Sequence, residues 1–119
     1  MSRAGIPVDR FCVCCTSVWD EGWFLLTAGE NRPGAFNTMT VSWGFFGTIW
    51  SRPMAQVVVR PNRHTHGFLH EGDSFTLSGF SPDHRRSLAY CGSHSGRDVG
   101  LCGGVVGARH RVDPCSHGT

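Results

Sequence analysis

The chain of 119 residues contains no lysine, so all eleven of its basic side chains are arginines, set against nine acidic residues. Charged residues make up only 17% of the chain, compared with about 25% in an average globular protein. The net charge of +2 is too small to indicate a general role with nucleic acid or at a membrane surface. The basic residues are instead concentrated locally in the second half of the chain, at Arg60, Arg63, Arg85, Arg86 and Arg97.

Long apolar runs are also missing. No run approaches the roughly 18 residues that a membrane span requires, and the first eight residues lack the apolar core of a signal peptide. We therefore expect a cytoplasmic protein without a membrane contact. Its six cysteines are then thiols in a reducing compartment. Cys12, Cys14 and Cys15 crowd together while the other three are scattered, which is a poor spacing for zinc, and we predict no metal site.

Glycine and large aromatic residues are abundant, with 16 Gly, eight Phe and four Trp. This mixture favours a β-rich domain with tight turns over a helical bundle, and the length suits one domain. We assign the domain to residues 18–99. Residues 1–17 show no period and are predicted to form an arm. Residues 100–119 contain five glycines and no aromatic residue, and are predicted to be a disordered tail.

Hydrophobic patterns and turn residues predict the elements of this domain. Strands are expected at 23–28, from 36 to about 46, at 55–59 and at 75–80. A short helix is expected after Thr65 as its N-cap, and a second helix from Ser81 to Gly92. Because strands and helices do not alternate regularly, the order predicts a mainly β (α+β) protein, an antiparallel barrel with short helical inserts.

Three polar segments stand out from this pattern. In the first, Thr38, Thr40 and Ser42 would share one strand face, either solvated or turned toward a polar ligand. In the second, Arg60 and Arg63 frame Pro61 between a strand and a helix, where guanidinium groups and helix N–H groups suit an oxyanion. The third, residues 92–98, is a loop of small residues and hydroxyls that could wrap a polar group or simply lie at the surface.

The same segments carry a family resemblance. The motifs are Asn-Thr-Met-Thr-x-Ser-Trp-Gly at 37–44, Gly-x-x-Trp-x-x-Pro at 47–53, Val-Arg-Pro-x-Arg-x-Thr at 59–65, Phe-Thr-Leu-Ser at 75–78 and Gly-x-x-Ser-Gly-Arg-Asp at 92–98. They closely resemble the flavin reductase-like, flavoredoxin-type FMN-binding split-barrel proteins, over roughly residues 18–99. The resemblance implies a Greek-key split barrel and a homodimer with FMN near the subunit interface.

The resemblance also implies roles for particular residues. The isoalloxazine ring would lie along residues 37–40, the phosphate would bind at the arginine-bearing junction, and the loop after the second helix would close over the cofactor. Trp43 and Trp50 are large enough to shield a ring face, but they suit a core position equally well. The cofactor-binding residues expected on this basis are Asn37, Thr38, Met39, Thr40, Ser42, Trp43, Arg60, Pro61, Arg63, His64, Thr65, Ser95, Gly96 and Arg97.

The pattern of the family stops at Val99, where Gly-Leu-Cys-Gly-Gly follows in place of Asp-Lys and the strands that complete the barrel. We interpret this as a lost reading frame or truncation near Val99, which would leave the C-terminal part of the barrel incomplete. The function expected is an oxidoreductase that passes electrons from NAD(P)H or a protein donor through FMN. The alternatives are a non-enzymatic FMN electron carrier with a redox partner protein, an inactive fragment, and a Cys/His metal-binding module.

Overall fold

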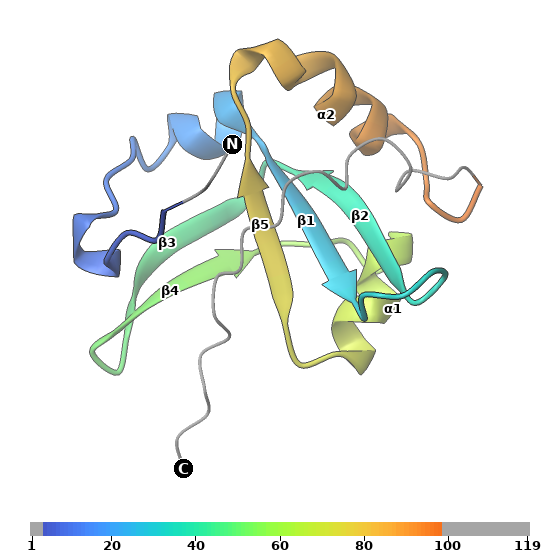
Figure 1. The fold of residues 1–119 in the computed structure, drawn as a ribbon, viewed down its shortest axis with the longest axis horizontal. Coiled ribbons are helices and arrows are strands. Elements are labelled where there is room, and N and C mark those ends of the chain that lie inside the picture. Colours follow the sequence, from blue (N-terminus) through green and yellow to red (C-terminus); the bar gives the residue numbers. More distant parts are fainter. Residues whose placement is uncertain (1–3, 99–119) are drawn as a thin grey trace.

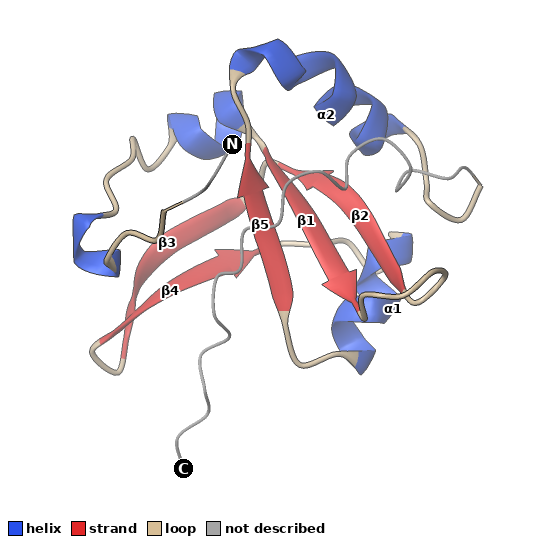
Figure 2. Cartoon of the chain, in the orientation of Figure 1, coloured by secondary structure: helices blue, strands red, loops and turns tan. Residues whose placement is uncertain are grey.

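A three-stranded and a two-stranded antiparallel sheet make up the β structure of the computed structural model, which describes residues 4–98 (Figures 1 and 2). The strands are β1 (Phe24–Gly29), β2 (Phe36–Val41), β3 (Gly44–Ile49), β4 (Arg52–Val57) and β5 (Phe75–Gly79). The two α-helices are α1 (His64–Glu71) and α2 (Arg85–Ser93). Shorter helical turns occupy Val8–Arg10, Val18–Gly22 and Pro82–His84.

The three-stranded sheet has the order β2-β1-β5, with β1 in the centre. Leu26 of β1 pairs with Met39 of β2 on one side and with Leu77 of β5 on the other. The continuous apolar sequence of β1 is explained by this position, because a central strand covered on both faces needs apolar side chains in both directions. Leu26 itself has no exposed surface.

Each face of this sheet packs against a different group of elements. On one face, Phe24 and Leu26 form the main core with Trp19, and the rings of Trp19 and Phe46 lie 5.0 Å apart. Helix α1 contacts β1 and β2, and its Leu69 packs on this core. The opposite face carries a second cluster, in which Leu25 packs against Leu88 and Cys91 of α2. Strands β1 and β2 are therefore held between the two helices.

Strands β3 and β4 form a separate hairpin, seen beside the three-stranded sheet in Figure 1. Trp50 and Ser51 are its two turn residues, and both have positive φ angles, 47° and 58°. Positive φ at both central residues is the requirement of a type I′ turn, the two-residue turn whose twist matches that of the flanking strands. Alternate residues of β3 face opposite ways, so that Phe46 packs in the core while Phe45 and Ile49 are exposed.

The structure corrects two of the predicted strands. The segment expected from 36 to about 46 is two strands in two different sheets, separated at Ser42 and Trp43. The strand expected at 55–59 begins earlier, at Arg52, and ends at Val57, so that Pro53 lies within it. A proline is tolerated there because, among the described strands, β4 pairs only with β3. A residue that cannot donate a backbone hydrogen bond is acceptable in such an edge strand.

The second predicted helix also differs in detail. Pro82–His84 is a 3₁₀ turn that leads into α2, and Gly92 lies inside α2, which ends one residue later. The spacing of His84, Leu88 and Cys91 at i, i+4 and i+7 predicts one inward face of this helix. Leu88 and Cys91 are buried as this spacing predicts, whereas His84 is exposed. The first helix agrees closely with its predicted range, although Thr65 lies in its first turn and Arg63 takes the N-cap position.

The mainly β (α+β) architecture of antiparallel strands with short helices is confirmed. Within residues 4–98 the strands form two separate sheets and not a closed barrel. The predicted tail, residues 100–119, lies outside the described residues, as does the point near Val99 where we expect the frame to be lost. Over residues 4–98, none of the helices has the length and apolar character needed to cross a membrane.

Candidate functional site

The outer edge of β2 is the place where the polar segments meet. Strand β2 has β1 on one side and no described strand on the other, so that part of its backbone is free to bond with something else. Beside this edge is a pocket of about 80 Å³. Residues from β2, from the start of α1 and from the end of α2 with its following loop line it, namely Asn37, Thr38, Met39, Asn62, Arg63, His64, Thr65, Cys91, Gly92, His94, Ser95 and Gly96.

Asn37 joins all three segments. Its side chain is buried, and its Nδ2 donates a hydrogen bond of 2.8 Å to Thr65 Oγ1 in the first turn of α1. Its Oδ1 lies against Gly96, where an added Cβ atom would come within 1.8 Å of that oxygen. Only a glycine therefore allows the loop to approach Asn37 so closely. The convergence of residues 37–39, 63–65 and 95–96 on one pocket rests on these two contacts.

The hydroxyl groups of β2 are largely used within the protein. Thr38 Oγ1 lies 2.6 Å from Thr27 Oγ1 on β1, and Thr40 Oγ1 donates to the backbone oxygen of Leu88 on α2. The sequence left two possibilities for these hydroxyls, contact with solvent or with a ligand. The structure shows a third, which is hydrogen bonding within the protein. Thr40 bonds to α2, which packs over this face of the sheet, and Thr38 bonds to the neighbouring strand.

The basic junction lies at the start of α1. Arg63 is the N-cap residue of this helix, with an extended backbone (φ −81°, ψ 137°), and it lines the pocket together with His64 and Thr65. The first N–H groups of a helix have no partner within the helix, and the helix dipole places partial positive charge there. This end of the pocket therefore offers a guanidinium group, backbone N–H groups and a hydroxyl to an anion.

A family model described as "Flavin reductase like domain" matches residues 20–105. The chain belongs to the flavin reductase-like family. The crystal structure of flavoredoxin from Methanosarcina acetivorans has a similar fold, with a TM-score of 0.58 and 24% sequence identity over 83% of this chain. The match covers 48% of that flavoredoxin chain, so this chain spans about half of its length. No curated protein matches the sequence.

Membership of the flavin reductase-like family implies that the protein binds a flavin, and the donor groups at α1 suit the phosphate of a flavin nucleotide. The volume of the pocket, about 80 Å³, holds a few water-sized groups, each of which needs on the order of 10–15 Å³. That is enough for a phosphate and the atoms attached to it, and too little for a three-ring system. The pocket therefore has room for one end of a flavin nucleotide and not for the whole of it.

Not every residue expected from the sequence lines this pocket. Arg60 places its guanidinium carbon 4.8 Å from the centre of the Trp43 ring, and Trp43 and Trp50 are 51% and 92% exposed. The interpretation of the two tryptophans as core residues is therefore wrong. The expected residues that do not line the pocket are Thr40, Ser42, Trp43, Arg60, Pro61 and Arg97.

Four residues of the pocket were missed in the sequence. Asn62 lies between two expected contacts, and Cys91, Gly92 and His94 come from the last turn of α2 and its C-cap. The helical spacing predicted that Cys91 would face inward. That Gly92 packs against Thr40, with 3.5 Å between an added Cβ and the threonine Cβ, depends on the approach of α2 to the sheet, which no local pattern reveals.

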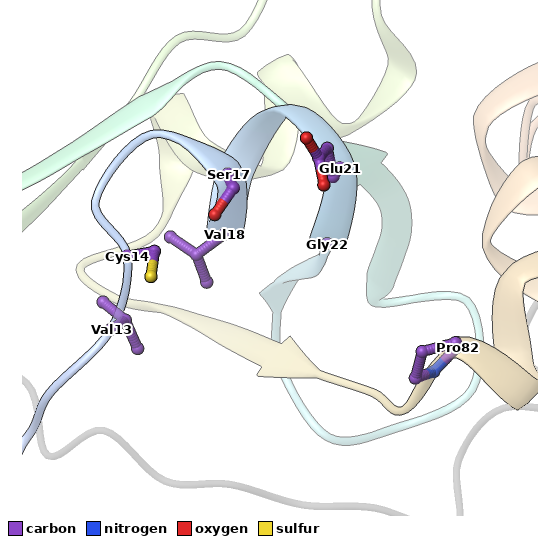
Figure 3. Close-up of a pocket in the computed structure, with 7 residues that line it drawn as sticks. All are labelled: Val13, Cys14, Ser17, Val18, Glu21, Gly22 and Pro82. Carbon is purple, nitrogen blue, oxygen red and sulfur yellow. The ribbon is translucent and has the colours of Figure 1, made fainter.

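A larger hollow of about 440 Å³ lies at the other end of β1, around the turn Val18–Gly22 (Figure 3). Val13, Cys14 and Val18 gather on one side of it and Pro82 lies on the other, as Figure 3 shows. Its lining includes one acidic side chain, Glu21, and no basic one. This hollow is therefore unsuited to an anionic cofactor, and the smaller pocket at β2 is the candidate site.

Proposed function

We propose that the protein binds FMN at the edge of β2 and passes electrons through it, taking them from NAD(P)H or from a protein donor. The observation that carries this proposal is the meeting of three segments, distant in the sequence, at one pocket. Each segment brings a different chemistry: an amide and hydroxyls from β2, an anion site from α1, and a close-packed glycine loop after α2. Family membership supports the flavin.

The phosphate of FMN belongs at the start of α1 in this proposal. A phosphate monoester carries about −1.5 to −2 charges near neutral pH, so it needs several donors and at least one cation. Arg63 supplies the cation and His64 and Thr65 begin the helix, where N–H groups and the dipole favour an anion. A guanidinium–phosphate contact is also stronger than a neutral hydrogen bond.

The phosphate position at the start of α1 then determines how the other predicted contacts are assigned. The ring system would follow the edge of β2 along residues 37–40, and residues 95–97 would close over the cofactor. Ser42, Pro61 and the stacked pair of Arg60 and Trp43 lie outside the small pocket, and we assign them to the part of FMN that the pocket cannot hold. Trp43, Arg60 and Pro61 are exposed and Ser42 is half-buried, which leaves them accessible to such a ligand.

The chemistry of the proposed site is divided between cofactor and chain. Bound FMN supplies the capacity to accept and release one or two electrons. The chain binds the cofactor and fixes its position, and Asn37 is suited to this because its amide is already held by Thr65. A buried, hydrogen-bonded side chain keeps its position without a further cost in conformational freedom when the ligand binds.

We also propose that the protein is a homodimer with FMN near the interface. The β3–β4 hairpin exposes several large apolar side chains, with Phe45 63%, Ile49 51% and Trp50 92% exposed. Large exposed apolar side chains gathered on one hairpin favour an interaction site. A second copy of the chain covering the hairpin would bury these side chains.

Purified protein incubated with FMN tests the proposal directly. Binding should shift the visible absorption bands of the flavin and change its fluorescence, with saturation at one FMN per chain. If the protein is an enzyme, it should then oxidise NAD(P)H steadily in the presence of an electron acceptor. A protein that binds FMN without oxidising NAD(P)H would be an electron carrier. One that remains colourless after incubation with excess FMN would contradict the proposal and indicate an inactive fragment.

A further inference from the structure

His94, the C-cap residue of α2, lines the pocket beside β2 and is held in a defined position. Its backbone N–H donates to the backbone oxygen of Tyr90 at 3.0 Å. Its ring is stacked on the Tyr90 ring, with 4.0 Å between centroids and an angle of 20° between the planes. The main chain and the stacking together fix where the imidazole lies, although both rings are at the surface.

The hydrogen-bond partners of His94 favour a proton on one of its two ring nitrogens, Nδ1. Nδ1 lies 3.1 Å from the backbone oxygen of Tyr90, and a carbonyl oxygen can only accept. Nδ1 is also 3.0 Å from Ser93 Oγ, whose own proton is directed to the backbone oxygen of Ala89 at 3.0 Å. Both neighbours therefore call for a proton on Nδ1. In the neutral imidazole this leaves Nε2 as an acceptor, to which none of residues 4–98 is hydrogen-bonded.

As an acceptor, Nε2 of His94 can bind only a group that donates a hydrogen bond. The dianionic phosphate of FMN has no proton to donate, and in the proposed site it lies at the start of α1. The atoms that follow the phosphate in FMN are the hydroxyl groups of the ribityl chain, which are donors. The carbonyl end of a helix also favours donors over anions, and His94 lies at this end of α2.

We infer that His94 recognises the polyol chain of the flavin, with Nε2 accepting a hydrogen bond from a ribityl hydroxyl. This inference rests on the proposed FMN site and adds a specificity determinant to it. It predicts that the protein distinguishes flavins that carry the ribityl chain from flavins that lack it. A position at which the motif at 92–98 specifies no residue would then contribute to cofactor choice.

Three flavins distinguish recognition of the phosphate, the ribityl chain and the rings. They are FMN, riboflavin, which lacks the phosphate, and lumiflavin, which has a methyl group in place of the whole ribityl chain. His94→Asn keeps a polar atom near Nδ1 and loses the one at Nε2, whereas His94→Gln keeps a polar atom near Nε2. Dissociation constants for the three flavins should be measured by fluorescence titration with the full-length protein. His70→Asn is the matched control, because His70 is exposed on α1 and does not line the pocket.

His94→Asn should weaken FMN and riboflavin by the same factor, roughly three- to tenfold, as expected for one net hydrogen bond. Lumiflavin should bind to this variant as it does to the unaltered protein. His94→Gln should retain most of the affinity, and His70→Asn all of it. The far-ultraviolet circular dichroism of each variant shows whether it is folded.

Other patterns would overturn the inference. A loss confined to FMN would assign His94 to the phosphate, and an equal loss for all three flavins would assign it to the rings or to the general structure of the loop. No loss in His94→Asn would mean that Nε2 contacts nothing. If the unaltered protein bound no flavin, the proposed function would fail together with this inference, whereas tight FMN binding that His94→Asn leaves unchanged would overturn the inference alone.

Discussion

Asn37 shows how a single side chain can organise the candidate site. It is a polar residue in a strand that is otherwise mostly apolar, and it is buried. A buried amide must be hydrogen-bonded, because an unpaired polar group in the interior costs about 1–3 kcal/mol. Asn37 meets this requirement by donating to Thr65, which ties β2 to α1 at the edge of the pocket.

Thr65→Val tests this link. The change keeps the shape of the side chain and removes the acceptor, so that the amide of Asn37 loses its partner. We expect the free energy of unfolding to fall by about 1–3 kcal/mol, measured by urea denaturation. Thr48→Val, at an exposed position in β3, is the control and should change stability by less than about 0.5 kcal/mol. An equal urea midpoint for Thr65→Val and the unaltered protein would contradict the assigned role.

Gly96→Ala tests the contact of the loop with Asn37. The new methyl group would lie 1.8 Å from Asn37 Oδ1, so the loop must move away from β2. Overpacking of this kind costs typically about 1–3 kcal/mol, and we expect FMN to bind about tenfold or more weakly while the fold is retained. Gly67→Ala is the control, since nothing lies within 4 Å of its added Cβ; it should leave FMN binding unchanged.

The sequence indicates some of these residues better than others. Asn37 could be identified because it interrupts an apolar strand, and Arg63 because it stands between a strand and a helix. His94 could not be identified, because its role depends on how its ring lies on Tyr90 and on where the end of α2 meets β2. The hydrogen-bond partners of the Thr38 and Thr40 hydroxyls could not be predicted either, because they lie on another strand or far away in the sequence.

Among the elements, the β3–β4 hairpin contains the most unusual backbone. Its turn residues, Trp50 and Ser51, both have positive φ, a conformation that costs a residue with a side chain roughly 1–2 kcal/mol. Asn-Gly is the sequence that suits this turn best. The protein thus keeps an unfavourable turn that displays a tryptophan at the tip of the hairpin, in accord with our proposal that the hairpin contacts a second copy.

Replacing the turn by Trp50→Asn and Ser51→Gly should relieve this strain. We expect the free energy of unfolding to rise by about 1–2 kcal/mol in urea denaturation of the monomer. Gly34→Ala provides the opposite case: Gly34 has a φ of 76° and nothing within 4 Å of an added Cβ, so only its backbone conformation is affected, and stability should fall by about 1 kcal/mol. A double variant no more stable than the unaltered chain would contradict the strain at Trp50 and Ser51.

The division of residues 36–46 into two strands shows where local patterns stop being informative. The sequence continues with apolar and β-branched residues through Trp43, so it favours one long strand. The structure instead places β3 against Trp19, whose ring occupies the place of a side chain at position 44: an added Cβ on Gly44 would lie 2.3 Å from it. Because Trp19 is 25 positions earlier in the sequence, no local pattern reveals this contact.

For the molecule as a whole, the proposed dimer makes a clear prediction. Sedimentation should give twice the mass of one chain, and the double variant Phe45→Ser with Ile49→Ser should give a monomer, because both side chains are exposed on the hairpin. Ile6→Ser with Val8→Ser is the matched control. These residues are similarly exposed, 63% and 59%, but lie in the N-terminal segment, so the control should remain a dimer. A monomer at every concentration of the unaltered chain would disprove the proposal.

The overall architecture could be predicted more fully than its details. Antiparallel strands with short helices followed from the order of the apolar runs and from the turn residues, and the motifs indicated the family that the family model then showed. The arrangement of strands into two sheets could not be predicted, because it depends on pairings between segments that are distant in sequence, such as β1 with β5.

The most direct test of the site as a whole compares FMN with riboflavin. If a phosphorylated flavin binds where the three segments meet, the unaltered protein should bind FMN more tightly than riboflavin. Arg63→Gln should then weaken FMN by about ten- to a hundredfold, as expected for a hydrogen bond to a charged group, and leave riboflavin unchanged. Arg86→Gln, exposed on α2, should affect neither flavin. Equal binding of the two flavins, or an Arg63→Gln protein that binds FMN as tightly as before, would contradict the assignment.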